Sequence, residues 1–184
     1  MVVLVNGSFG VGKTTVARLL RGALPGSVIY DPEWAGMALM RLAKLARLKG
    51  PGVEDFQHFP LWRKSAVAGV RLFRSFARGP VIVPMTFCRR AYFDEVFAGI
   101  RRFDSDVRVF CLKAGLPTVK ERLARRGDVA EGPGADWMAR RIAECAEAHR
   151  DPHFGEPVET EDRPAREVAE DLLQRLRTSN VQTA

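Results

Sequence analysis

The chain has 184 residues, of which 46% are hydrophobic, and a formal net charge of +7. This length suits one domain that buries a hydrophobic core without disulfides, and the three cysteines lack metal-ligand spacing, so we expect reduced thiols in a cytoplasmic protein. The chain shows no basic leader and no run of about 18 apolar residues, which predicts neither secretion nor a membrane span.

Residues 6–14, with the sequence Asn-Gly-Ser-Phe-Gly-Val-Gly-Lys-Thr, match the phosphate-binding pattern G-x-x-x-x-G-K-[ST]. A β-branched run at residues 2–5 precedes them, and apolar residues recur at helical spacing over residues 16–23. A strand, a glycine-rich loop and a helix in this order form the context that the pattern requires. We therefore expect the chain to bind a nucleoside triphosphate.

The residue types of this loop fit the wrapping of a triphosphate. Gly7, Gly10 and Gly12 let the backbone approach the phosphates closely, in conformations that other residues avoid. The helix that follows adds the partial positive charge of its N-terminus, and Lys13 adds a cation for the β- and γ-phosphates. The Thr14 hydroxyl suits Mg²⁺, which prefers oxygen ligands. The predicted ATP and Mg²⁺ site is completed by Ser8, Phe9, Val11 and Thr15.

The remaining chain alternates between short apolar runs and helical patterns. Strands are expected at residues 27–30, 81–85, 106–112 and 157–159. Helices are expected at residues 34–48, 59–76, 94–102, 136–150 and 164–177, and from Pro117 through Arg126. This alternation predicts an α/β fold: a parallel sheet of about five strands with helices on both faces, formed by residues 1–184 as a single domain.

Ligands of such sheets bind beyond the carboxyl ends of the strands. Asp31 follows the second strand, where it could accept a proton from an attacking hydroxyl or hold magnesium through water. Alternatively, Asp31 forms an Asx-Pro turn or caps the next helix. Pro84 and Met85 stand where a standard ATPase has a magnesium-binding aspartate, and this difference argues against a motor-type ATPase.

Guanine recognition by Asn-Lys-x-Asp is excluded, because the only asparagines are Asn6 and Asn180. The class that remains is the small-molecule and nucleotide kinases, which combine a phosphate loop with an arginine-bearing lid. We expect a lid at residues 127–134, with Arg122 and Arg126 stabilising the charge on the transferring phosphoryl group.

Four segments together resemble the tunicamycin resistance proteins. They are residues 6–14, the strand and turn at 82–87, the segment Arg-Leu-Ala-Arg-Arg-Gly-Asp at 122–128, and Glu-Thr-Glu-Asp at 159–162. The resemblance implies a P-loop kinase-like, three-layer α/β/α fold and resistance to an antibiotic that mimics a UDP-sugar with a lipid tail. Chloramphenicol phosphotransferases and gluconate or shikimate kinases are similar too, so the acceptor stays open.

An antibiotic of this kind would suit the aromatic middle of the chain. Its rings could lie on Trp34, Phe56, Phe59 or Trp62, near Thr86 and Arg89. The alternative is that these aromatic side chains fill a helical core. The protein would then act either as an ATP-dependent kinase of the drug or another metabolite, or as an ATP-dependent binder that sequesters the drug without chemistry.

The charge is unevenly distributed. Residues 41–102 carry 13 Lys and Arg against 4 Asp and Glu, whereas residues 151–184 carry 4 against 8. A basic surface can bind nucleic acid, anionic lipid or a phosphorylated ligand, or can simply be solvated. We find no motif that reads a nucleic-acid groove and expect a small-molecule partner. The closing helix could contact a membrane surface through its apolar stripe or pack on the sheet.

Overall fold

The computed structural model describes residues 1–33, 36, 55–127 and 133–181. The predicted helix at residues 34–48, Trp34 included, lies outside the described residues except for position 36. Most of the predicted lid lies outside them as well. Residues 32–33 and 36 are helical.

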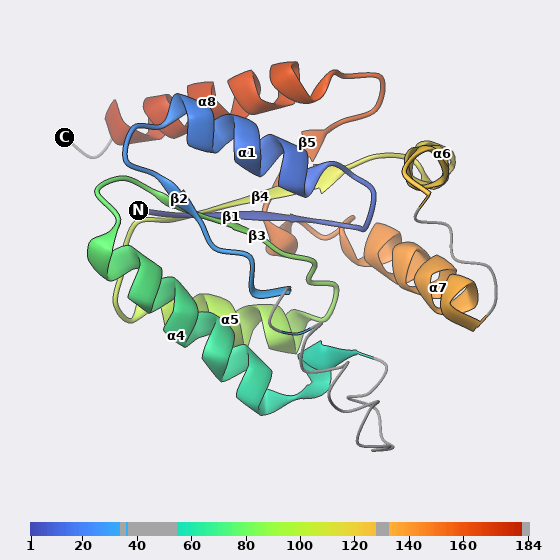
Figure 1. Cartoon of the computed structure of the whole chain (residues 1–184), viewed down its shortest axis with the longest axis horizontal. Coiled ribbons are helices and arrows are strands. Elements are labelled where there is room, and N and C mark those ends of the chain that lie inside the picture. The colour runs from blue at the N-terminus through green and yellow to red at the C-terminus, as the bar shows by residue number, and fades with distance from the viewer. Residues whose placement is uncertain (34–35, 37–54, 128–132, 182–184) are drawn as a thin grey trace.

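The sequence predicted a parallel sheet of about five strands, and five parallel strands form one sheet in the order β2-β3-β1-β4-β5 (Figure 1). The strands are β1 (Val2–Gly7), β2 (Val28–Ile29), β3 (Val81–Pro84), β4 (Val107–Lys113) and β5 (Glu156–Glu159). In the centre, Val5 pairs with Pro84 of β3 and with Phe110 of β4. The first strand is buried along its whole length because helices cover both of its faces.

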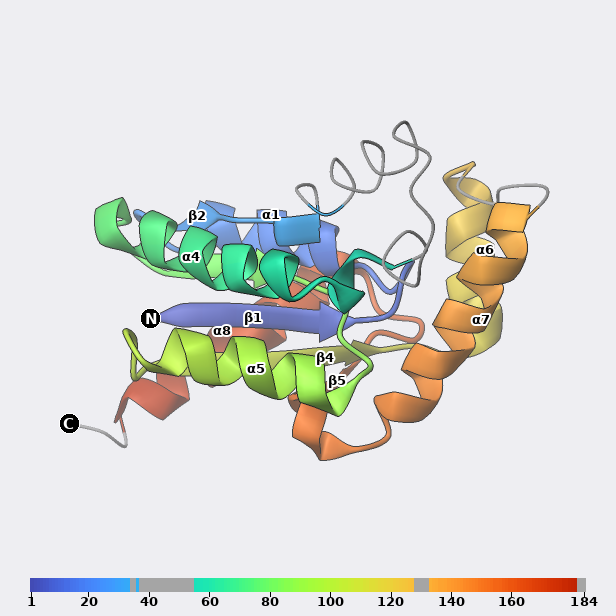
Figure 2. The same ribbon diagram turned by 90° about the horizontal axis from the view of Figure 1, so that it is seen from below.

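The helices form a layer on each face of the sheet and a third group beyond its carboxyl edge. One face carries α1 (Lys13–Ala23) and α8 (Ala165–Val181); the other carries α4 (Pro60–Phe76) and α5 (Arg90–Arg101) (Figure 1). Figure 2 shows β1 pointing toward the end where α6 (Leu116–Arg125) and α7 (Pro133–Ala148) lie. Two short 3₁₀ helices, η1 (Phe56–His58) and η2 (Pro152–Phe154), complete the described elements.

Alternate side chains of β1 enter two separate cores. Val3 and Val5 pack with α1 and α8, whereas Val2 and Leu4 pack with α4 and α5. This alternation follows from the twofold period of a strand, and it makes β1 the rigid support of the loop that follows it.

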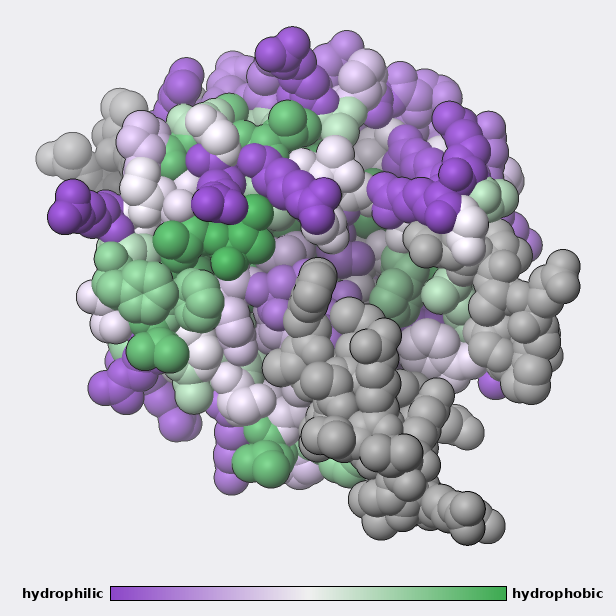
Figure 3. Space-filling model, viewed as in Figure 1, coloured by the Kyte–Doolittle hydropathy of each residue, from purple (hydrophilic) through white to green (hydrophobic). Residues whose placement is uncertain are grey.

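The apolar stripe of α8 is covered. Val168, Leu172 and Leu176 are buried in the core that α8 shares with α1. The opposite side of α8 is hydrophilic, as the purple surface at the top of Figure 3 shows. Packing on the sheet therefore accounts for the stripe, and no described helix is long and apolar enough to cross a membrane.

The predicted start of α7 is wrong. The sequence placed Pro133 and Gly134 in a polar loop and started the helix at residue 136, but α7 already begins at Pro133. Proline is well suited to the first turn of a helix, where its missing N–H has no partner to lose.

Candidate functional site

The loop between β1 and α1 is closed tightly around two glycines. Gly10 has φ 76° and Gly12 has φ 109°, a range that side chains other than glycine rarely adopt. A Cβ at Gly10 would lie 2.9 Å from Leu123 Cγ and 3.1 Å from the Val119 carbonyl oxygen. Helix α6 thus packs against the outside of the loop, while the space beside Gly12 is open within 4 Å.

The N-terminus of α1 is left available for an anion. Gly12 occupies the capping position without a side chain that could bond the first N–H groups, and the first turn contains no acidic residue. Thr14 and Thr15 are exposed on this turn. The unpaired N–H groups and the helix dipole together favour negative charge at this point.

Lys13 lies inside the loop. Its side chain is 8% exposed, its Nζ donates a hydrogen bond of 2.9 Å to the Ser8 carbonyl oxygen, and it lies 5.6 Å from the centre of the Phe9 ring. Burial lowers the pKa of this ammonium group, and the carboxylates of Glu33 and Asp31 oppose that shift. The loop therefore holds a buried cation, and the carboxylates of Asp31 and Glu33, just after β2, supply negative charge near it.

Asp31 and Glu33 follow β2 at the carboxyl edge. Asp31 Oδ1 accepts a hydrogen bond of 3.0 Å from the Glu33 N–H, which is the capping turn considered as an alternative in the sequence. The turn and the electrostatic contact with Lys13 coexist, so capping does not exclude a role in chemistry. The sequence analysis missed Glu33, whose Oε1 is buried without a hydrogen-bond partner among the described residues.

Two side chains fix the turn after β3 through three hydrogen bonds. Asn6 Oδ1 accepts from the Phe87 N–H at 2.8 Å, and its Nδ2 donates to the Phe87 carbonyl oxygen at 3.3 Å. His149, the residue after α7, donates from Nε2 to the same oxygen at 2.7 Å, and burial lowers the pKa of its imidazole to about 4. Thr86 is 1% exposed, and its Oγ1 has no hydrogen-bond partner in the described part of the chain.

The two predicted lid arginines occupy different positions. Arg122 is half-buried and donates to the Val11 carbonyl oxygen at 3.3 Å and to the Thr160 carbonyl oxygen at 2.7 Å, which ties the phosphate loop to the turn after β5. Arg126 is exposed. It lines a cavity of about 240 Å³ together with Gly12, Thr15 and Val168. Their roles in charge stabilisation stay predictions.

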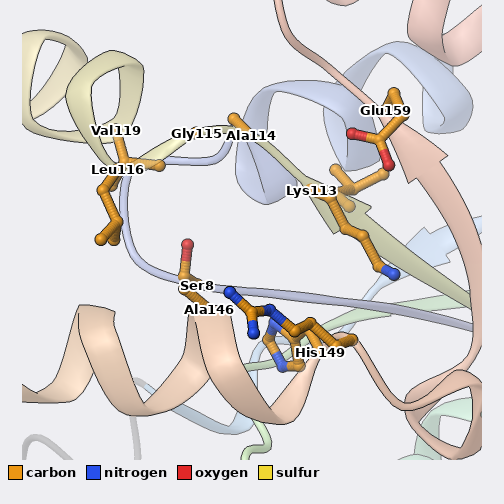
Figure 4. Close-up of a pocket in the computed structure, with 11 residues that line it drawn as sticks. Ser8, Lys113, Ala114, Gly115, Leu116, Val119, Ala146, His149 and Glu159 are labelled. Carbon is orange, nitrogen blue, oxygen red and sulfur yellow. The ribbon is translucent and has the colours of Figure 1, made fainter.

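A second cavity, of about 250 Å³, lies on the α7 side of the phosphate loop. In Figure 4, Ser8 of the loop, Lys113 of β4 and His149, which follows α7, surround this hollow, with Glu159 of β5 at its far side. Ser8 of the phosphate loop therefore lines this second cavity.

The predicted acceptor residues separate into two groups. Phe56 and Trp62 are buried with ring centres 4.7 Å apart, and Phe59 packs against the same core. Trp62 Nε1 donates to the Pro32 carbonyl oxygen at 3.1 Å. These contacts are those of the alternative, core-filling interpretation. Arg89 instead lines a separate polar cavity, whose other arginines and tryptophan the sequence analysis did not single out.

A family model described as an AAA domain matches residues 2–149. The chain belongs to this AAA domain family. A comparison with curated proteins gives no match. The family and the strand order of the sheet together show that this chain has a nucleotide-binding, kinase-like fold.

Solved structures of kinases and of a resistance protein are similar to this AAA domain. The tunicamycin resistance protein of Deinococcus radiodurans matches with a TM-score of 0.73 and 27% identity, over 95% of this chain and 94% of that chain. A gluconokinase from Sinorhizobium meliloti 1021 matches with a TM-score of 0.66 and 16% identity, over 99% and 96%. A shikimate kinase from Acinetobacter baumannii, in complex with shikimate, matches with a TM-score of 0.59 and 17% identity, over 97% and 93%. The predicted resemblance and the P-loop kinase-like fold are confirmed.

Proposed function

We propose that this protein transfers the γ-phosphoryl group of ATP to a hydroxyl group of a small molecule, and that tunicamycin or a related nucleoside antibiotic is an acceptor. The observation that carries the proposal is the position of Lys13, a buried cation at a helix N-terminus that has no side-chain cap, with the carboxylates of Asp31 and Glu33 raising its pKa against the effect of burial. The likeness to a tunicamycin resistance protein supports the choice of antibiotic.

The residues present fit ATP. The N–H groups at the start of α1 and the Lys13 ammonium would bind the β- and γ-phosphates. The cavity beside Gly12 and Thr15 continues from these N–H groups and would take the nucleoside, with Val168 as an apolar wall and Arg126 at its rim. Arg122 would act by holding Val11, and so the loop, in place.

The residues also fit Mg²⁺, which would neutralise the phosphate oxygens when bound. No three His, Cys, Asp or Glu side chains of the described residues form a metal cluster, but Mg²⁺ is commonly held by one or two protein oxygens together with phosphates. The exposed Thr14 hydroxyl and the buried Oε1 of Glu33, which has no hydrogen-bond partner within the described parts of the chain, are oxygens of this kind. Thr14 would be the direct protein ligand, and Glu33 would bind through water.

In the proposed reaction, Asp31 takes the proton of the acceptor hydroxyl as its oxygen forms a bond to the γ-phosphorus. The bond from that phosphorus to the β–γ bridging oxygen breaks, and ADP leaves with the electron pair. Lys13 and the α1 N-terminus stabilise the charge that develops on the phosphoryl oxygens.

The experiment is to incubate the full chain with ATP, Mg²⁺ and tunicamycin, and to measure ADP release and the mass of the drug. A drug that gains one phosphoryl group, with an equal amount of ADP, supports the proposal. A drug that binds only with ATP and keeps its mass would favour sequestration without chemistry. This alternative is suggested by the end of β3, where Pro84 and the following Met85 supply no carboxylate. No ATP binding would refute both.

A further inference from the structure

A polar cavity of about 130 Å³ lies between η1, the start of α5 and α7. It is lined by three arginines, Arg89, Arg140 and Arg141, together with Trp137, His58 and two carboxylates. Nothing in the nucleotide site described above accounts for this concentration of guanidinium groups.

The cavity is one aromatic layer away from the phosphate loop. The Trp137 ring lies beside the Phe9 ring with centres 6.0 Å apart, and the Lys13 ammonium lies 5.6 Å from the centre of the same Phe9 ring. Trp137 therefore connects the lining of the polar cavity with the phosphate loop.

Arg141 forms the rigid base of the cavity. It is 5% exposed, and its guanidinium pairs with Asp55 at 2.9 Å and with Glu144 at 3.3 Å. It also donates to Gln57 Oε1 at 3.2 Å. Both lining carboxylates pair with Arg141 in the described residues, and three guanidinium groups against two carboxylates leave the lining with an excess of positive charge.

Arg89 and Arg140 have no carboxylate partner among the described residues. The Arg89 guanidinium lies 5.9 Å from the centre of the Tyr92 ring. Two guanidinium groups at one hollow repel each other, an anion between them would relieve that repulsion, and planar guanidinium groups match carboxylate and phosphate oxygens.

We propose that this cavity binds a negatively charged group of the acceptor, a carboxylate or a phosphate monoester, through Arg89 and Arg140. Calling the bound molecule the acceptor rests on the proposed phosphoryl transfer. The existence of the anion site does not depend on that reaction. The inference predicts that hydroxyl compounds carrying such a group bind more tightly than otherwise similar uncharged compounds.

The test measures the binding of matched probes to the full chain by calorimetry, with a non-hydrolysable ATP analogue and Mg²⁺ present. Gluconate is compared with sorbitol, and glucose 6-phosphate with glucose, so that each anion has a neutral counterpart. The variants are Arg140→Gln and Arg89→Gln, and Arg166→Gln on α8 is the control with the same loss of charge at an exposed position.

We expect at least one anion to bind roughly tenfold or more tightly than its neutral counterpart, and Arg140→Gln or Arg89→Gln to remove roughly tenfold of that affinity. Arg166→Gln should bind as the unchanged chain does. Preference for gluconate or for glucose 6-phosphate identifies a carboxylate or a phosphate. Equal affinity for charged and neutral probes, binding of neither, or anion binding that both variants retain would overturn the inference.

A second set of reactions, with the same proteins and ATP in place of the non-hydrolysable analogue, separates this inference from the proposed function. ADP formed with tunicamycin or sorbitol, together with no preference for anions, would leave phosphoryl transfer standing and overturn the anion site. Arginine-dependent anion binding without ADP from any acceptor would leave the anion site standing and remove the proposed reaction.

Discussion

The ammonium group of Lys13 donates a hydrogen bond to the carbonyl oxygen of Ser8, which precedes it in the same loop. The Lys13 ammonium group therefore binds the backbone of the phosphate loop itself, and it also lies beside the Phe9 ring. Phosphate oxygens would have to replace this carbonyl as the partner of the ammonium group. Because burial disfavours the charged form of Lys13, a triphosphate would gain from a cation that is already desolvated.

Lys13→Met should abolish most ATP binding while the protein stays folded, because the substitution removes the buried cation and keeps an unbranched side chain of similar length. Loss of a charge-assisted hydrogen bond of about 1.5–3 kcal/mol predicts a Kd for ATP that is roughly 10- to 100-fold higher. Lys120→Met, at an exposed position of α6, is the matched control. An unchanged Kd for ATP in Lys13→Met would refute the phosphate-loop assignment.

Asp31→Asn should separate catalysis from capping. Asparagine caps a helix as well as aspartate does, so the free energy of unfolding should change by less than about 1 kcal/mol. Asparagine cannot accept the proton, so turnover should fall by roughly 10²–10⁴ while ATP still binds. Melting temperature and acceptor-dependent ADP release are to be measured on one sample. Full turnover would mean that the base lies elsewhere.

Glu33→Gln tests the second carboxylate of this turn. It should raise the Mg²⁺ concentration needed for half-maximal turnover, since the buried Oε1 would lose its charge but keep its place. Maximal turnover at saturating Mg²⁺ should fall less than in Asp31→Asn. If Glu33→Gln instead shows the larger loss at saturating Mg²⁺, the assignment of the proton acceptor moves from Asp31 to Glu33.

The sequence predicts the sheet and the phosphate loop because both depend on local signals. Runs such as residues 2–5 are apolar throughout only where helices cover both faces, and the glycine spacing of residues 7–12 has a conformational cause. The capping turn at Asp31 was likewise visible as an alternative, since Asp-Pro is a local turn signal.

The polar cavity could not be predicted because its members come together only through tertiary packing. Arg89 follows β3, whereas Arg140 and Arg141 lie on α7, and no sequence spacing relates these segments. Similarly, Phe56 and Trp62 have the composition of a ligand platform, but packing decides that they fill the core. Glu33 could have been predicted from the sequence, because it lies two residues after Asp31 at the same edge of the sheet.

Gly10→Ala should destabilise the protein, because the new Cβ would lie 2.9 Å from Leu123 Cγ at a φ of 76°. Strain and overpacking together predict a loss of about 1–3 kcal/mol in the free energy of unfolding. Gly22→Ala, in α1 with nothing within 4 Å of the new methyl group, should instead stabilise by about 0.5–1 kcal/mol. Urea unfolding of both variants checks the pair, and equal effects would contradict the tight contact between α6 and the loop.

His149 should make stability depend on pH between about 4 and 6.5. Burial lowers its folded-state pKa from 6.5 to about 4, so between these values the unfolded chain binds a proton that the folded protein does not. The contribution of neutral His149 to the free energy of unfolding is fully present above pH 6.5 and is lost as the pH falls. The loss is complete below about pH 4 and amounts to about 3 kcal/mol.

The measurement compares urea unfolding of the unchanged chain and of His149→Gln from pH 7 to pH 4. The glutamine amide can still donate to the Phe87 carbonyl oxygen but does not titrate, and all other ionisable groups are the same in both proteins. The difference in unfolding free energy should therefore shift in favour of the variant as the pH falls through this window, because only the unchanged chain loses the histidine term. Parallel curves would show that His149 can be protonated in place, and that its hydrogen bond to Phe87 does not depend on a neutral imidazole.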